Sequence, residues 1–112
     1  MFKIYHNPRC SKSRETLKIL TDQGVQLEVV EYLKTPITLD ELEVIYKALA
    51  LPVEKMIRTK EETFLSSEVD LGDIHSVFKA IQKDPILLER PIVLKGNLAV
   101  LGRPPENVFK LI

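Results

Sequence analysis

Apolar positions in the first third of the chain switch between strand-like and helix-like spacing. Residues 2–5 (FKIY) form a short apolar run, and residues 27–32 (LEVVEY) roughly alternate and are rich in β-branched and aromatic side chains, so both predict strands. Residues 11–23 between them contain good helix formers with leucines spaced for one face, and Gly24 is placed to end that helix. A strand, a helix and a strand joined by short links predict a βαβ unit with parallel strands.

The middle of the chain has helical periodicity. Thr38 and Glu41 have the spacing of a capping box and precede an apolar stripe. A second stripe has the spacing of a buried helix face and consists of Ile74, Val77, Phe78 and Ile81. Either Asp70 or Asp73 is placed to cap this second helix. Residues 52–67, between the two helices, predict only one or two short helical turns.

The last third returns to strands. Residues 92–95 (IVLK) and 98–101 (LAVL) flank a two-residue turn that begins with glycine, which predicts a β-hairpin. The prolines at 104–105 are placed to open a short C-terminal helix. The order βαβ, helical insert, ββα predicts an α/β fold, with one four-stranded mixed sheet and helices on both faces. This is the thioredoxin-like arrangement.

Length and charge narrow the class of protein. A chain of 112 residues predicts a single domain, residues 1–112. Sixteen basic residues offset sixteen acidic ones, so net charge does not indicate nucleic-acid or membrane binding, and any electropositive site must be local. No apolar run reaches the ~18 residues of a membrane span, and the start lacks the layout of a signal peptide. We therefore expect a cytoplasmic protein, and a monomer.

Cys10 is the only cysteine, and it lies where the first helix is expected to begin. A single cysteine cannot form an internal disulfide, which fits a reducing compartment. Unpaired backbone N–H groups and the helix dipole lower the pKa of a thiol at a helix start. Positive charge nearby in the sequence is expected to add to this effect, from His6, Arg9, Lys12 and Arg14. These features predict that Cys10 is a nucleophile instead of a core residue.

Ser13 occupies the position at which a dithiol oxidoreductase would carry its second cysteine. Its hydroxyl either donates a hydrogen bond to the Cys10 thiolate or belongs to an exposed first-turn serine, and spacing does not separate the two. A hydroxyl cannot resolve a mixed disulfide. The resolving thiol must therefore come from another molecule.

Two Arg-Pro pairs flank the predicted hairpin, Arg90-Pro91 before it and Arg103-Pro104 after it. Hairpin geometry brings both pairs to one edge of the sheet, facing the first helix, so the two arginines suggest an oxyanion site. Pro91 is expected to be cis, because thioredoxin-like folds place a cis proline opposite the active thiol. Two histidines and one cysteine lack metal-ligand spacing, and we predict no metal site and no bound cofactor.

Four segments together resemble one known family. They are IYHNPRCSKSRETL at 4–17, MIRTK at 56–60, ERPIV at 89–93 and GRPPE at 102–106. In order and spacing these segments resemble the glutaredoxin-linked arsenate reductases of the ArsC type, and more closely the arsenate-reductase-like bacterial branch. The resemblance runs from residue 2 to 112. It departs at Ser11-Lys12, where plasmid-type arsenate reductases carry small neutral residues, and this departure bears on substrate specificity.

The resemblance implies a role for each matching residue. Cys10 matches the nucleophile, Arg58, Arg90 and Arg103 match three arginines around the oxyanion, and His6 and Ser13 match residues that favour the thiolate. Arg58 is identified only in this way, since its own sequence context indicates an exposed charge.

The resemblance also implies a reaction. Arsenate forms a covalent adduct with Cys10, glutathione serves as co-substrate, and glutaredoxin is the partner that restores the thiol. Two alternatives stay open: a glutathione-dependent thiol reductase on the same fold, and a regulator resembling Spx that binds RNA polymerase. Ser13 in place of a second cysteine and the full arginine set argue against the regulator.

Overall fold

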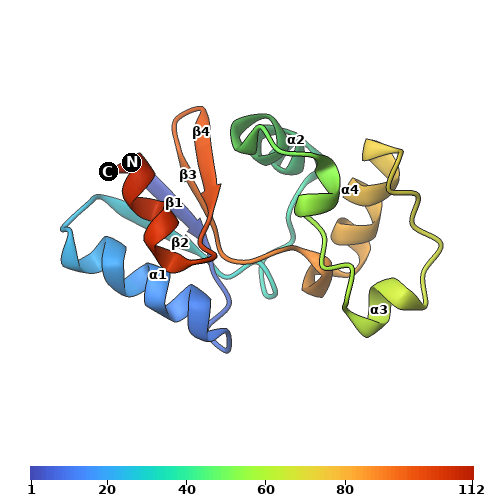
Figure 1. Cartoon of the computed structure of the whole chain (residues 1–112), viewed down its shortest axis with the longest axis horizontal. Helices are drawn as coiled ribbons and strands as arrows, with labels where there is room; N and C mark the ends of the chain where they lie inside the picture. The colour runs from blue at the N-terminus through green and yellow to red at the C-terminus, as the bar shows by residue number, and fades with distance from the viewer.

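The computed structural model describes all 112 residues, and its elements follow the predicted order (Figure 1). The strands are β1 (Phe2–Tyr5), β2 (Leu27–Val30), β3 (Ile92–Lys95) and β4 (Leu98–Leu101). The α-helices are α1 (Ser11–Asp22), α2 (Leu39–Leu49), α3 (Glu62–Leu65) and α4 (Ile74–Lys83). Three short 3₁₀ helices complete the chain: η1 (Val53–Lys55), η2 (Pro85–Leu87) and η3 (Pro105–Leu111).

The four strands form one mixed sheet in the order β2-β1-β3-β4. β1 is parallel to β2 and antiparallel to β3, and β3 is antiparallel to β4, which confirms the predicted βαβ unit and hairpin. One row of paired residues crosses the sheet, Val30, Tyr5, Ile92 and Leu101. The chain leaves β1, β2 and β4 just beyond this row and enters β3 there. Four segments that are far apart in the sequence therefore meet at one edge of the sheet.

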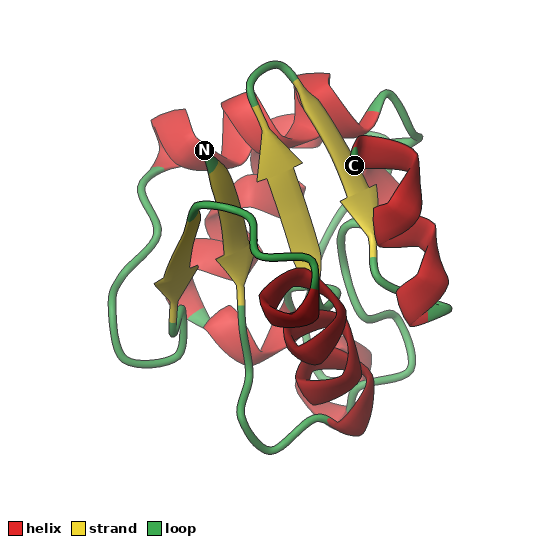
Figure 2. Cartoon of the chain, turned by 90° about the vertical axis from the view of Figure 1, so that its left-hand side faces the viewer, coloured by secondary structure: helices red, strands yellow, loops and turns green.

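Helices lie on both faces of the sheet (Figure 2), and each face has its own hydrophobic core. α1 and η3 cover one face, and their core consists of Phe2, Ile4, Leu20, Val93, Val108 and Leu111. The helices of the insert cover the other face with a larger core of 17 buried residues, which includes Tyr5, Tyr32, Leu42, Ile45, Ile81 and Ile92. The alternation of apolar side chains along each strand supplies both cores. The thioredoxin-like, four-stranded mixed sheet is thus confirmed.

The helix ends follow local chemistry that the sequence predicts. The Thr38 hydroxyl accepts from the Glu41 N–H at 3.1 Å, and the Glu41 carboxylate accepts from the Thr38 N–H at 3.2 Å, which confirms the capping box. Asp73 caps α4 by accepting from the His75 N–H at 3.0 Å. Gly24 follows α1 with a φ of +69°, the left-handed conformation that favours glycine.

One strand differs from the prediction. β2 ends at Val30 instead of residue 32, because the chain turns at Glu31, whose carbonyl accepts from the N–H groups of Lys34 and Thr35. This turn carries Tyr32 into the interior, where it is 1% exposed. The predicted short C-terminal helix is confirmed as η3, a 3₁₀ helix that ends at Leu111. None of the helices combines the length and apolar character that crossing a membrane requires.

Candidate active site

Cys10 is the N-cap residue of α1, as the sequence predicts. Its backbone is extended, with φ −95° and ψ 121°, and its carbonyl accepts the first helical hydrogen bond, from Arg14 N–H at 3.0 Å. The Cys10 N–H donates a hydrogen bond to the Asn7 carbonyl at 3.0 Å, so the preceding loop is fixed as well. The thiol is 7% exposed. Cys10 is therefore held at the open end of the helix, next to N–H groups that have no helical partner.

The surroundings of Cys10 favour its thiolate. Burial by itself raises the pKa of the thiol. The backbone N–H groups of Ser13 and Lys12 and the charges of Arg90 and Arg103 outweigh this effect, and the pKa of Cys10 lies below its ordinary value. The predicted lowering is therefore found, but the charges responsible lie at the far end of the chain.

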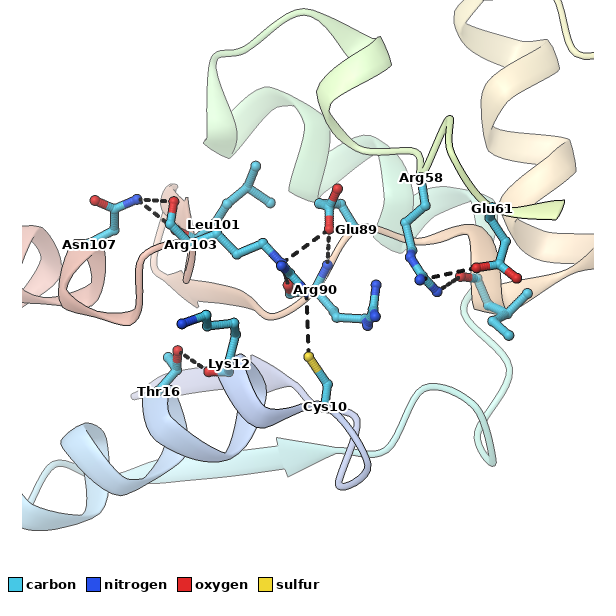
Figure 3. Close-up of polar contacts among 11 residues, drawn as sticks. Cys10, Lys12, Thr16, Arg58, Glu61, Glu89, Arg90, Leu101, Arg103 and Asn107 are labelled. Carbon is cyan, nitrogen blue, oxygen red and sulfur yellow. Dashed lines mark hydrogen bonds and ion pairs between the residues drawn. The ribbon is translucent and has the colours of Figure 1, made fainter. Parts of the chain in front are cut away.

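Arg103 makes direct contact with the thiol. Its Nη2 donates to Cys10 Sγ at 3.6 Å, and its Nε donates to the Arg90 carbonyl at 2.7 Å (Figure 3). Glu89 joins the same group: one carboxylate oxygen accepts from the Arg90 N–H at 3.2 Å and lies 3.4 Å from Arg103 Nε. The peptide bonds Arg90-Pro91, as predicted, and Arg103-Pro104 are both cis. The two Arg-Pro pairs thus meet beside Cys10.

Arg58 reaches this edge of the sheet from the helical insert. Ile57 forms an isolated antiparallel bridge with Leu88, and the Arg58 N–H donates to the Leu87 carbonyl at 2.7 Å. The guanidinium donates to the Ile86 carbonyl at 3.1 Å and forms an ion pair with Glu61 at 3.0 Å. This β-type pairing places Arg58 next to the segment that leads into Arg90.

The three arginines line one cleft, which has a volume of about 510 Å³. In Figure 3 the Arg90 guanidinium extends between Arg58 and Cys10. The lining of the cleft also includes the carboxylates of Glu61 and Glu89, each of which forms an ion pair with an arginine. In this cleft Arg58 and Arg103 are paired with carboxylates, whereas the Arg90 guanidinium has no carboxylate partner.

Ser13 and His6 behave differently from the prediction. Ser13 is fully buried, so the reading of an exposed serine is wrong. Its hydroxyl lies 2.6 Å from His6 Nδ1 and accepts from the Asn7 N–H at 3.0 Å, and neither contact involves the thiol. Ser13 favours the thiolate through its backbone N–H instead.

His6 does not supply the positive charge expected of it. Burial lowers the pKa of His6, the charge of Arg14 lowers it further, and Glu31 only partly opposes them, so the imidazole is neutral at pH 7. The other cations close to Cys10 in the sequence also point elsewhere: Arg14 donates to the Pro8 carbonyl, and Lys12 pairs with Glu15 at 3.6 Å. His6 and Ser13 thus hold the loop around Cys10 in place.

Sequence reasoning missed three residues at this edge: Glu61, Glu89 and Tyr32. The i, i+3 spacing of Arg58 and Glu61 is a signal that could have indicated their ion pair. Nothing local distinguishes Glu89 or Tyr32 from an ordinary surface or core residue. No group of three or more histidine, cysteine, aspartate or glutamate side chains is arranged to hold a metal ion.

Comparison with known proteins decides the family. The model of the ArsC family matches residues 5–111. The chain belongs to the ArsC family. Cys10, Arg58, Arg90 and Arg103 all lie inside the matched range.

Relatives of this ArsC family member cover nearly its whole length. A protein named arsenate reductase from Haemophilus influenzae is 45% identical over 97% of both chains. One of the same name from Neisseria meningitidis serogroup A is 44% identical, over 95% of this chain and 93% of its own. Among solved structures, an arsenate reductase from Vibrio cholerae has a TM-score of 0.89 at 45% identity, covering 99% of this chain and 97% of its own.

Proposed function

We propose that this protein reduces arsenate to arsenite, with Cys10 as the nucleophile and Arg58, Arg90 and Arg103 as the oxyanion-binding groups. The observation that carries the proposal is the 3.6 Å contact between Arg103 Nη2 and Cys10 Sγ at a cleft lined by all three arginines. A guanidinium shared by a thiolate and a bound oxyanion brings the nucleophile and the arsenic together. The names of the relatives agree with this substrate.

The first step forms a covalent adduct. The Cys10 thiolate attacks arsenic, the arsenic–sulfur bond forms, and the bond from arsenic to one hydroxyl group breaks; this hydroxyl takes up a proton from solvent and departs as water. Like-charge repulsion between the thiolate and the anion opposes this approach. The arginines reduce that repulsion and stabilise the charge that develops on the oxygens.

The later steps need a second thiol, because the chain has no other cysteine. In the proposed sequence, glutathione sulfur bonds to Cys10 sulfur, and the electron pair of the sulfur–arsenic bond stays on arsenic, which falls from +5 to +3. Arsenite leaves, and a glutaredoxin thiol attacks the Cys10–glutathione disulfide and restores the Cys10 thiol. The two electrons that reduce arsenic come from the two sulfurs that form the disulfide.

A coupled assay tests the proposal. Purified protein is mixed with arsenate, glutathione, glutaredoxin, glutathione reductase and NADPH, and both NADPH oxidation and arsenite are measured. We expect both to depend on arsenate, on glutathione and on glutaredoxin. Cys10→Ser should abolish both while the circular dichroism and melting temperature stay close to wild type, because one oxygen replaces one sulfur at a helix start.

Three outcomes would contradict the proposal. Arsenite formation by Cys10→Ser would show that Cys10 is not the nucleophile. Arsenate-dependent turnover without glutathione would show that glutathione is not the co-substrate. Turnover of a glutathione mixed disulfide, with none of arsenate, would favour a thiol reductase on the same fold.

A further inference from the structure

Only two buried side-chain nitrogen or oxygen atoms lack a hydrogen-bond partner within the protein, Tyr32 Oη and Arg90 Nε. Buried polar groups without a partner lose their hydration without compensation, so native proteins rarely keep them without a reason. Tyr32 follows the end of β2 and Arg90 precedes the start of β3. Both residues therefore belong to the edge of the sheet at which the chain also places Cys10.

Backbone contacts fix Tyr32 at this position. The Val30 carbonyl at the end of β2 accepts from the His6 N–H at 2.8 Å, which ties β2 to the loop before Cys10. The Glu31 carbonyl then accepts from Lys34 N–H at 2.9 Å and closes the turn. The Tyr32 ring packs into the core under the insert and is 1% exposed. The apolar ring is thus well accommodated, and only the hydroxyl is without a partner.

The electrostatic surroundings of the hydroxyl come from the candidate active site. Burial raises the pKa of Tyr32 to about 12, and the charges of Arg90 and Arg58 oppose the rise, whereas Cys10 and Glu89 add to it. All four of these groups belong to the arginine cleft or the thiol. The phenol is therefore protonated at neutral pH and available as a neutral donor.

Tyr5 shows how the same fold treats a buried tyrosine whose hydroxyl can reach a carboxylate. Tyr5 is also 1% exposed and lies in the same core, but its hydroxyl donates to a Glu41 carboxylate oxygen at 3.3 Å. The two tyrosines thus have the same burial and differ in whether the hydroxyl is paired. The unpaired one is the tyrosine beside the arginines.

We propose that the Tyr32 hydroxyl, behind the arginine cleft and beside Arg90 Nε, donates a hydrogen bond to an oxygen of the tetrahedral anion bound next to Cys10. This inference rests on the proposed function for the identity of the anion. A neutral donor suits this position because it stabilises anionic oxygens without adding positive charge to a cleft that already holds three arginines. Anion binding would give the hydroxyl the partner that it lacks within the protein.

Tyr32→Phe tests the inference, because it removes the hydroxyl and keeps the ring. We expect kcat/KM for arsenate to fall about 10-fold or more, as for the loss of a hydrogen bond to a charged group. The melting temperature should stay the same or rise, because the lost hydroxyl had no partner in the protein. The rate at which iodoacetamide alkylates Cys10 should be unchanged.

Tyr5→Phe is the matched control. It removes the hydroxyl of an equally buried tyrosine, and this hydroxyl has a partner, so the melting temperature should fall while arsenate kinetics stay at the wild-type level. If Tyr32→Phe instead lowers the melting temperature as Tyr5→Phe does and leaves kcat/KM unchanged, Tyr32 is structural and the inference is overturned.

A binding measurement separates this inference from the proposed function. Arsenate, phosphate and sulfate are titrated calorimetrically into Cys10→Ser and into the double variant Cys10→Ser, Tyr32→Phe. Binding weakened about 10-fold in the double variant supports the inference even if the wild type reduces no arsenate. Equal binding by both variants overturns the inference and leaves arsenate reduction standing. Absence of oxyanion binding by Cys10→Ser overturns the inference as well.

Discussion

At the scale of single residues, the charged groups that lower the pKa of Cys10 are distant in sequence, although backbone N–H groups of Ser13 and Lys12 also contribute. Arg103, 93 residues away, touches the sulfur, whereas the cations nearest in sequence bind other partners. Arg58 differs from Arg90 and Arg103 because it is not among the groups that lower the pKa of Cys10. The arginines therefore have two separable effects, one on the thiol and one on the oxyanion.

Alanine at each arginine should separate the two effects. Arg58→Ala, Arg90→Ala and Arg103→Ala should each lower kcat/KM for arsenate by roughly 10- to 150-fold, the loss of one charge-assisted contact. Arg90→Ala and Arg103→Ala should also raise the pKa of Cys10, measured as the pH dependence of iodoacetamide alkylation, and Arg58→Ala should not. The exposed Arg9 is the control, and Arg9→Ala should change neither kcat/KM for arsenate nor the pH dependence of Cys10 alkylation. If Arg90→Ala and Arg103→Ala both keep the wild-type kcat/KM for arsenate, the proposed oxyanion site is wrong.

At the scale of elements, the site depends on how closely the end of β4 approaches α1 and Pro91. Gly102 is buried at this crossing, and its N–H donates to the Pro91 carbonyl at 2.9 Å. A Cβ at residue 102 would lie 2.5 Å from Thr16 Oγ1 and 2.6 Å from Pro91 Cγ, closer than van der Waals contact allows. The absence of a side chain at Gly102 thus lets Arg103 reach Cys10 and the Arg90 carbonyl.

Gly102→Ala should therefore weaken both the fold and the site. Overpacking of this kind destabilises a protein by about 1–3 kcal/mol, and urea unfolding should show a loss of that size. At a temperature where the variant stays folded, kcat/KM for arsenate should also fall, because Arg103 is displaced from the thiol. Gly72→Ala is the control: its Cβ would meet only the Asp70 carboxylate tip, at 3.2 Å, so little change is expected. If the free energy of unfolding of Gly102→Ala equals that of the wild type, residue 102 does not approach Thr16 and Pro91 this closely.

At the scale of the whole molecule, the cleft lies between the sheet and the helical insert. Figure 1 shows the sheet with α1 at one end of the long axis and α3 and α4 at the other, and the molecule measures 42 × 27 × 23 Å. Arg58 belongs to the insert, and Arg90 and Arg103 flank the hairpin. The cleft therefore forms only when both parts are folded and the Ile57–Leu88 bridge joins them.

The folded state should also be stabilised by ionisation of Cys10. The pKa of Cys10 is lower in the folded protein than the ordinary value of a free thiol. Such a group contributes stability that is fully present above the unfolded pKa and is lost as pH falls through the folded pKa. The test is urea unfolding of wild type and Cys10→Ser at pH values that span the folded and unfolded pKa of Cys10. The unfolding free energy of wild type should increase relative to that of Cys10→Ser as pH rises. A constant difference would contradict a lowered pKa.

Much of the fold follows from the sequence alone, because its determinants are local. Apolar periodicity places the strands and helices within a few residues, and the capping box at Thr38 and the positive φ of Gly24 depend only on neighbouring backbone. The position of Cys10 at a helix start is local as well. The hairpin brings Arg90 and Arg103 together because two paired strands must return to the same edge.

Other features of the site exist only in the tertiary structure. Arg58 lies in a segment without regular periodicity, and a single bridge to a distant residue sets its position. Burial makes His6 neutral, turns the Ser13 hydroxyl away from the thiol and leaves Tyr32 Oη without a partner, and none of these can be inferred from neighbours in sequence. Burial and electrostatic interaction depend on which groups share a volume of space. Sequence therefore supplies the elements and the thiol, whereas packing decides which charges reach it.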